Sequence, residues 1–206
     1  DLVLVQHLVT VGLGGGFEAD DLMATLSRRA RAEGLGVWLV SPDKDLGQLL
    51  TEDAPAVRMV DLRRRRGIDG DAFHQQHGVR PSQAVDYFAL TGDSSDNIAG
   101  VPGVGPKAAQ ILIETFGSLE GIYQNLATIP EMGIRGARSL ANKIDAGRKD
   151  AFLARELVRL RYDVPLEISG RIQDVCRWQG AHPEAEHFFN EIGALGPLQR
   201  LPRVGL

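Results

Sequence analysis

Three short segments of the chain carry closely spaced carboxylates, the side chains best suited to hold divalent cations. The first segment holds Glu18, Asp20 and Asp21, the second holds Asp43 and Asp45, and the third holds Asp93 and Asp96. If the segments meet, their carboxylates repel one another strongly unless cations neutralise them. Because oxygen-only ligand sets suit Mg²⁺ or Mn²⁺ better than zinc, the pattern predicts a site for hard divalent ions. Two such ions about 3.5–4 Å apart activate water for phosphodiester hydrolysis, which is the chemistry we expect.

Each acidic segment also has a purely structural explanation. Acids at 18–21 fall where the first turn of a helix is expected, and acids there offset the helix dipole and cap free amides. Asp43 and Asp45 fit a Pro-Asp turn in which Asp45 caps the following helix, and residues 91–97 fit a turn of small polar residues. The metal hypothesis therefore depends on the three segments meeting in the fold.

The elements around these acids predict an α/β fold followed by helices. Short apolar runs at 8–13, 37–40 and 57–62 indicate strands, and apolar residues recur at helical spacing over 17–33. The alternation predicts a parallel sheet covered by helices, with Asp43 and Asp45 beyond the carboxyl end of a strand, where ligand sites collect. We expect three parts: residues 1–78 with the metal site, residues 79–165 built of helices, and a C-terminal extension over 166–206.

A glycine-rich hairpin precedes a strong helical pattern. Residues 100–105 alternate glycine with valine and proline, and Pro106 suits the first position of the following helix. The glycines let the main chain approach another surface, and a helix N-terminus with Lys107 beside it can bind a phosphate without reading base sequence. This spacing is typical of helix-hairpin-helix elements that bind DNA, and a plain helix-helix turn is the alternative.

Composition narrows the class of protein. The chain has 206 residues, of which 43% are hydrophobic and 24% charged, as in ordinary globular proteins. No run of about 18 apolar residues indicates a membrane span, and the first residues lack the layout of a secretion signal. The single cysteine, Cys176, excludes an internal disulfide and a multi-cysteine zinc site. It agrees with a reducing compartment, so we expect the cytoplasm.

The net charge of −4 is weak evidence against a protein that binds polyanions in general. The acidic and basic residues are, however, segregated along the chain. The negative excess lies in residues 1–78, where the acids are paired while arginines cluster at 63–66. A metal site that faces a phosphate substrate needs such segregation.

Taken together, three motifs resemble the structure-specific 5′-nuclease family, which includes the 5′→3′ exonuclease domain of bacterial DNA polymerase I and the flap endonucleases. They are Phe-Glu-Ala-Asp-Asp at 17–21, Ser-Pro-Asp-Lys-Asp-Leu-Gly-Gln-Leu-Leu at 41–50, and the run from Leu90 to Ala109. The resemblance covers about residues 8–165. Within the family, the chain most resembles the stand-alone exonuclease IX type, because of residues 116–123 and because it is small and has no polymerase region. The resemblance implies a PIN-like, Rossmann-like sheet domain followed by a helix-hairpin-helix (helix-three-turn-helix) subdomain.

The resemblance also implies an activity and its ligands. It implies a Mg²⁺-dependent nuclease, with Mn²⁺ as an alternative ion, that acts on 5′-flap or branched DNA in repair and replication. The catalytic metal ligands would be Glu18, Asp20, Asp21, Asp43, Asp45, Asp93 and Asp96. A K⁺ ion would be held by main-chain oxygens of Leu90, Thr91, Ala99, Val101 and Val104, with Ala99 where proline is usual. The DNA contacts would be Gly103, Val104, Gly105, Pro106, Lys107 and Ala108. We expect a monomeric bacterial protein of the cytoplasm that binds DNA and no membrane.

One family feature is not found in the sequence. Members open with a strand that carries a further metal-binding Asp and then a helical arch, whereas this chain begins with Asp1 and reaches Glu18 directly. We therefore expect an N-terminally truncated chain. The missing segment favours one alternative, a non-catalytic or weakly catalytic protein that binds DNA junctions. A PIN-like ribonuclease, which shares the acid-rich end of the sheet, is a second alternative, and the hairpin argues against it.

Overall fold

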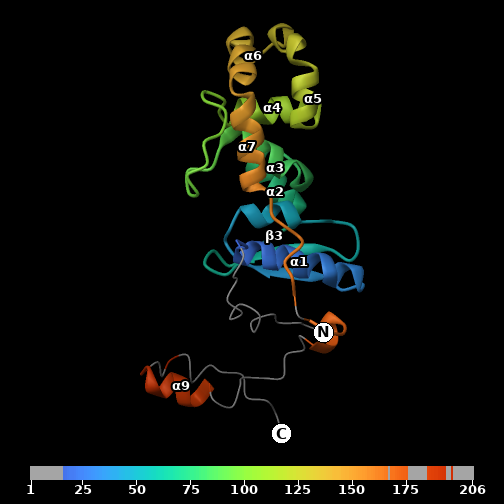
Figure 1. The fold of residues 1–206 in the computed structure, drawn as a ribbon, viewed down its shortest axis with the longest axis vertical. Helices are drawn as coiled ribbons and strands as arrows, with labels where there is room; N and C mark the ends of the chain where they lie inside the picture. Colours follow the sequence, from blue (N-terminus) through green and yellow to red (C-terminus); the bar gives the residue numbers. More distant parts are fainter. Residues whose placement is uncertain (1–15, 167, 176–184, 194–195, 197–206) are drawn as a thin grey trace. The chain divides into compact units, whose positions relative to one another are not determined.

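A computed structural model describes residues 16–166, 168–175, 185–193 and 196 (Figure 1). The chain divides into two compact units, one of residues 13–165 and one of residues 1–12 with 166–206. The strand expected at 8–13 lies outside the described residues.

The larger unit begins with the α/β part and continues into helices. Its first elements are helix α1 (Ala19–Ala32), strand β1 (Val37–Val40), the 3₁₀ helix η2 (Asp45–Leu49), strands β2 (Val57–Asp61) and β3 (Arg66–Ile68), and helix α2 (Gly70–His77). The later elements are η3 (Pro81–Gln83), α3 (Ala84–Thr91), α4 (Pro106–Phe116), α5 (Leu119–Gln124), η4 (Leu126–Glu131), α6 (Ala137–Ala146) and α7 (Arg148–Val158). The smaller unit contains α8 (Ile172–Val175) and α9 (Ala185–Glu191).

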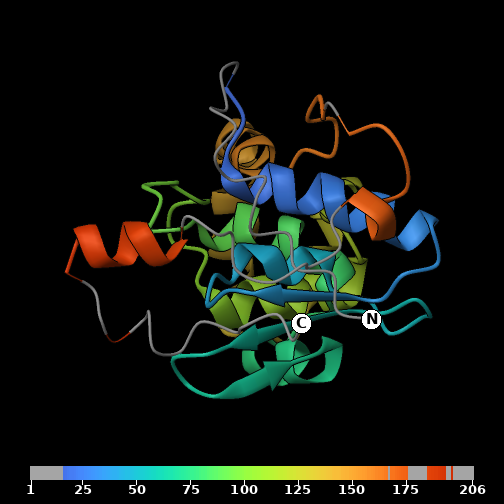
Figure 2. The same ribbon diagram turned by 90° about the horizontal axis from the view of Figure 1, so that it is seen from below.

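The three described strands form a mixed sheet in the order β1-β2-β3. The predicted parallel pairing is confirmed for β1 and β2, which pair from Val37 opposite Val57. The expectation of a wholly parallel sheet is wrong for β3, which runs antiparallel to β2. Only residues 62–65 join these two strands, whereas a parallel crossover needs a dozen residues or more. Figure 2 shows the strands side by side, with α1 nearest to β1 and α2 next to β3.

Helix α1 forms because its apolar residues recur at helical spacing. Leu22, Leu26 and Ala30 are buried on one face, and the helix ends before Gly34, which has a φ of +82°. One hydrophobic core continues from the sheet into the helices and includes Met59 of β2, Phe88 of α3 and Leu112 of α4. The expected boundary near residue 78 lies inside this core-sharing unit and stays a prediction.

A close backbone contact fixes the segment between α3 and α4. A Cβ atom added at Gly100 would overlap the backbone N of Gly92 and the O of Leu90, so these two stretches of main chain touch directly. Gly92 has a φ of +74°, which glycine adopts without strain. The main chain on both sides of the Asp93 turn is therefore held in place by backbone alone.

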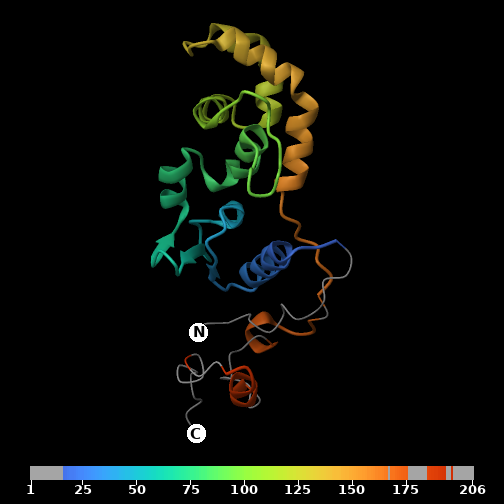
Figure 3. The ribbon, with the colours of Figure 1, turned by 90° about the vertical axis from the view of Figure 1, so that its left-hand side faces the viewer.

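An extended strap, residues 159–165, leads from α7 back to the α/β part (Figure 3). Its Leu160 N donates to Gln48 Oε1 of η2 at 3.1 Å, and its Arg161 N donates to Asp21 Oδ1 of α1 at 2.7 Å. Val164 N donates to Thr25 Oγ1 at 3.3 Å. The strap thus ties α7 to the two elements that carry the first and second acidic segments.

In the part of the chain that the structure describes, no helix combines the length and apolar character needed to cross a bilayer.

Candidate metal centre

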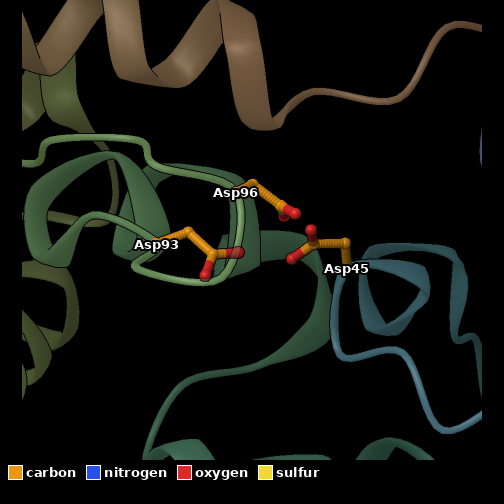
Figure 4. A group of neighbouring side chains, drawn as sticks. All are labelled: Asp45, Asp93 and Asp96. Carbon is orange, nitrogen blue, oxygen red and sulfur yellow. The ribbon is translucent and has the colours of Figure 1, made fainter.

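The second and third acidic segments meet at the end of β1. Asp45 begins η2, and Asp93 and Asp96 lie in the turn that follows α3. One carboxylate oxygen from each of these three residues lies within 4.8 Å of the other two. Figure 4 shows the carboxylates of Asp45 and Asp96 pointing toward each other across the gap between their segments. Residues almost fifty positions apart in the sequence therefore share one acidic cluster, which we define as Asp45, Asp93 and Asp96.

The turn after α3 is closed by its own backbone. Asp93 and Ile98 exchange two hydrogen bonds, each 2.8 Å from N to O. Ser95 donates to Asp93 Oδ1 from its N, at 3.0 Å, and from its Oγ, at 2.6 Å. Asn97 turns the chain with a φ of +56°, a conformation that asparagine tolerates better than most residues. The small polar residues of this turn thus orient Asp93, which is 4% exposed.

In the turn after β1, the side chain of Asp45 does not cap η2. Asp43 N donates to Ser41 Oγ at 3.1 Å, and Asp43 Oδ1 accepts from Asp45 N at 3.0 Å. The proposed structural role of Asp45 as a helix cap is therefore wrong, because Asp43 provides that acceptor. Among the described residues, Asp45 Oδ1 is a buried oxygen with no hydrogen-bond partner, and Lys44 Nζ lies 3.6 Å from it.

The first segment divides into residues with different surroundings. Asp21 is 8% exposed, and it accepts from Glu18 N at 3.1 Å and from Arg161 N at 2.7 Å, one bond at each oxygen. Asp21 therefore caps the start of α1 and anchors the strap. Asp20, the next residue back, instead lies in the electrostatic field of the other acidic segments.

Like charge and burial shift the pKa values of two of these acids upward. Burial, then the charges of Asp43 and Glu18 and others including Asp96, raise the pKa of Asp20 to about 6. Burial also raises the pKa of Asp45 to about 7; Lys44 opposes that rise, while the nearby aspartates add to it. Because Asp96 acts on both Asp20 and Asp45, the three segments share one electrostatic neighbourhood.

Lys44 lies inside the cluster. Its Nζ donates to Asp93 Oδ2 and, at 3.1 Å, to Ser95 Oγ. Burial would raise the pKa of Asp93, but the hydrogen bonds from Lys44 and Ser95 outweigh it and lower that pKa below its usual range. The lysine therefore neutralises part of the charge that the three aspartates bring together.

The cluster fits a hard divalent cation. All three donors are carboxylate oxygens, and the buried Oδ1 of Asp45 lacks the hydrogen bond that a buried oxygen normally has. Ligation by Asp45, Asp93 and Asp96, and by Glu18, Asp20, Asp21 and Asp43 around them, stays a prediction.

The segment expected to hold K⁺ is compact. Leu90 O accepts from Val101 N at 2.9 Å, and Val101 O accepts from Val104 N at 3.0 Å. With the contact between Gly92 and Gly100, these bonds hold the main chain near Leu90 against the main chain near Gly100 and Val101. Each carbonyl oxygen keeps a second lone pair for an ion. The K⁺ ligand set that also includes Thr91 and Ala99 stays a prediction.

The hairpin before α4 presents backbone to solvent. Gly103, Gly105, Pro106 and Lys107 are exposed, whereas Val104 is 5% exposed and anchors the loop in the core. Gly103 has a φ of +78°, and α4 begins at Pro106 as predicted. Lys143 of α6 places its Nζ 3.4 Å from Gly103 O. Lys143 thus adds a second cation to the hairpin that is expected to contact DNA.

Both halves of the chain match family models. Residues 5–78 match the 5′-3′ exonuclease N-terminal resolvase-like domain, and residues 79–183 match the 5′-3′ exonuclease C-terminal SAM fold. The chain belongs to the 5′-3′ exonuclease family. The resemblance drawn from the motifs is thereby confirmed.

Relatives of two kinds match. DNA polymerase I of Treponema pallidum is 42% identical over 168 residues, which cover 82% of this chain and 16% of the polymerase. Flap endonuclease Xni of Photorhabdus laumondii is 38% identical over 170 residues, which cover 82% of this chain and 63% of that protein. The chain thus spans only part of these relatives.

A solved structure with a similar fold contains bound divalent metal ions. The T5 5′-exonuclease with bound divalent zinc ions matches with a TM-score of 0.58 and 29% identity, over 69% of this chain and 50% of the T5 chain. A divalent metal in this family therefore agrees with the acidic cluster.

Sequence reasoning missed the partners of the acids. The hydrogen bond between Asp21 and the backbone of Arg161 joins residues 140 positions apart, and no local pattern signals it. Lys44 could have been found, because a lysine between two acids of a proposed metal site is a visible signal. Lys143 was only one of several scattered bases, and its place at the hairpin needs the fold.

We predict that Asp21→Ala destabilises the protein while Asp20→Ala does not. Asp21→Ala leaves the N–H groups of Glu18 and Arg161 without their acceptor, which should lower the free energy of unfolding by about 1–3 kcal/mol. Asp20→Ala, the matched control, removes a carboxylate whose pKa its acidic neighbours raise, so stability should hold or increase. Urea unfolding at pH 8 with EDTA measures both variants, and equal losses would contradict the division of roles.

We predict that Asp45 makes the metal-free protein less stable as pH rises. Its pKa is about 7 in the folded state, against an ordinary value of 3.8. Ionisation of Asp45 therefore costs free energy only in the folded state, and the free energy of unfolding falls progressively between about pH 4 and pH 7. Asp45→Asn should match the wild-type melting temperature near pH 4 and exceed it by roughly 10 °C at pH 8. Thermal melts in EDTA across this range test it; a difference that does not grow with pH would argue against a buried, repelled carboxylate.

Proposed function

We propose that this chain is the metal-holding and DNA-anchoring part of a Mg²⁺-dependent 5′-nuclease that hydrolyses phosphodiesters in 5′-flap or branched DNA. The observation that carries the proposal is the cluster of Asp45, Asp93 and Asp96, whose carboxylate oxygens lie within 4.8 Å of one another. The hairpin expected to contact DNA starts only four residues after Asp96. Similarity to a T5 flap endonuclease solved with DNA and metal ions supports this reading, at a TM-score of 0.58 and 28% identity.

The chemistry divides between the cation and the chain. Bound Mg²⁺, or Mn²⁺ in its place, supplies an activated water and stabilises the leaving oxygen. The carboxylates of Asp45, Asp93 and Asp96 would hold the cation, and Asp20 and Asp43 would add negative charge near it. The hairpin residues Gly103–Ala108 grip the phosphate backbone with N–H groups and Lys107, which orients the duplex without reading its sequence.

A K⁺ ion completes the proposed anchor. We assign it to the carbonyls of Leu90, Thr91, Ala99, Val101 and Val104, which flank the contact between Gly92 and Gly100. A cation held there adds positive charge close to the exposed hairpin, where a phosphate would bind. We further propose that the protein works as a monomer in the bacterial cytoplasm, in DNA repair and replication.

We predict that the intact protein cleaves a labelled 5′-flap DNA with Mg²⁺ or Mn²⁺ and that EDTA abolishes cleavage. Asp45→Asn and Asp93→Asn should each lower the rate by more than about 100-fold, since even indirect partners of metal ligands cost 10–100-fold. Asp53→Asn is the control, because the Asp53 side chain is 78% exposed and pairs with Arg31 at 2.9 Å, outside the cluster.

Two outcomes of this assay would contradict the proposal. A protein that binds the flap and leaves it uncut is a junction-binding protein. A protein that cuts an RNA strand in preference to the DNA flap is a ribonuclease.

We predict that Lys107→Ala weakens binding to flap DNA equally for all base sequences. One lost phosphate contact should reduce the slope of log K against log salt concentration by about 0.9. Lys143→Ala should act in the same direction, because its Nζ lies beside Gly103. Arg58→Ala serves as the control, since Arg58 lies on β2 beside Trp38. Fluorescence anisotropy at several salt concentrations measures the slopes, and an unchanged slope for Lys107→Ala would exclude a phosphate contact there.

A further inference from the structure

Lys44 is the cation that the fold itself places in the acidic cluster. It lies between Asp43 and Asp45 in the sequence, and its Nζ donates to Asp93 Oδ2 and to Ser95 Oγ. The same Nζ lies 3.6 Å from Asp45 Oδ1. One ammonium group therefore touches two of the three carboxylates that form the cluster.

The ammonium group of Lys44 has a further neighbour, the aromatic ring of Phe88. Its Nζ lies 5.8 Å from the centre of the Phe88 ring, a distance at which a cation is attracted by the ring face. Burial would lower the pKa of Lys44, but the hydrogen bond to Asp93 and the charges of Asp45 and Asp43 raise it above its ordinary value. The lysine is thus a permanent positive charge at a fixed place.

A divalent ion and Lys44 draw on the same oxygens. Asp93 Oδ2 can accept a hydrogen bond from the ammonium group of Lys44 or coordinate a metal ion. The positive charge of the ammonium group also repels a metal ion near Asp45 and Asp93. Filling the site therefore weakens or displaces the contact between Lys44 and Asp93. Without a divalent ion, that contact holds the η2 segment and the turn after α3 together.

We propose that Lys44 is a built-in counter-ion of the cluster, which stabilises the metal-free protein and weakens its affinity for divalent ions. It is a positioning residue that sets the ion concentration at which Asp45, Asp93 and Asp96 become occupied. This inference rests on the metal site of the proposed function.

Mn²⁺ titration of the intact protein, followed by electron paramagnetic resonance, tests the inference without measuring cleavage. Lys44→Met should bind Mn²⁺ roughly tenfold more tightly than wild type, because a nearby positive charge is gone. Lys44→Arg keeps the charge and should stay within about threefold of wild type. Lys149→Met, on the exposed surface of α7, is the control for loss of a lysine and should leave the affinity unchanged.

Thermal melts supply a second readout. In EDTA, Lys44→Met should melt below wild type, and saturating Mn²⁺ should raise its melting temperature by more than it raises that of wild type. If Lys44→Met does not fold, Lys44→Gln removes the charge but keeps a donor for Asp93, and it should also bind Mn²⁺ more tightly.

The outcomes separate the two proposals. Unchanged or weaker Mn²⁺ binding in the charge-removing variants overturns the role of Lys44 and leaves the metal site standing. Absence of Mn²⁺ binding in wild type and in Lys44→Met alike overturns the metal site and the role of Lys44 together.

Discussion

Repulsion between carboxylates is the force that the rest of this structure has to oppose. Two negative charges 4 Å apart repel by about 4 kcal/mol at an effective dielectric constant of 20, and this chain brings acids from three segments into one neighbourhood. Burial first, and then the charges of neighbouring acids, raise the pKa values of Asp20 and Asp45, so part of this repulsion remains in the folded protein. A fold that keeps such a cluster needs rigid backbone around it and positive charge within it.

The rigid backbone comes from contacts that do not depend on the acids themselves. Gly92 and Gly100 touch through main chain, and Asp93 and Ile98 exchange backbone hydrogen bonds; these contacts oppose an opening of the turn that would separate its charges. The strap fastens α1 and η2 to α7 through Asp21 and Gln48. Asp21 accepts one hydrogen bond at each of its oxygens, and both bonds help to fix the start of α1, where Asp20 lies.

Local patterns in the sequence were enough to predict the elements and the acidic residues, and they were insufficient for the contacts between them. The helix that begins beside Glu18, the parallel pair β1 and β2 and the helix starting at Pro106 follow from periodicity and from proline and glycine positions. The antiparallel β3 was missed because the arginine turn gives no strong hairpin signal. The pairing of Lys44 with Asp93 and of Asp21 with Arg161 depends on tertiary distances, which residue spacing does not encode.

The same backbone that holds the cluster also fixes its distance from the proposed DNA anchor. Asp96 and Gly100 belong to one short segment, and the contact between Gly92 and Gly100 lies between the cluster and the hairpin. Because these links are main chain rather than flexible side chains, they restrict movement of the hairpin relative to Asp93. On the proposed function, a duplex gripped at Gly103–Ala108 would present its backbone to the cluster at a set distance. Selection of the cleaved bond would then follow from geometry, with no need for contacts that read the bases.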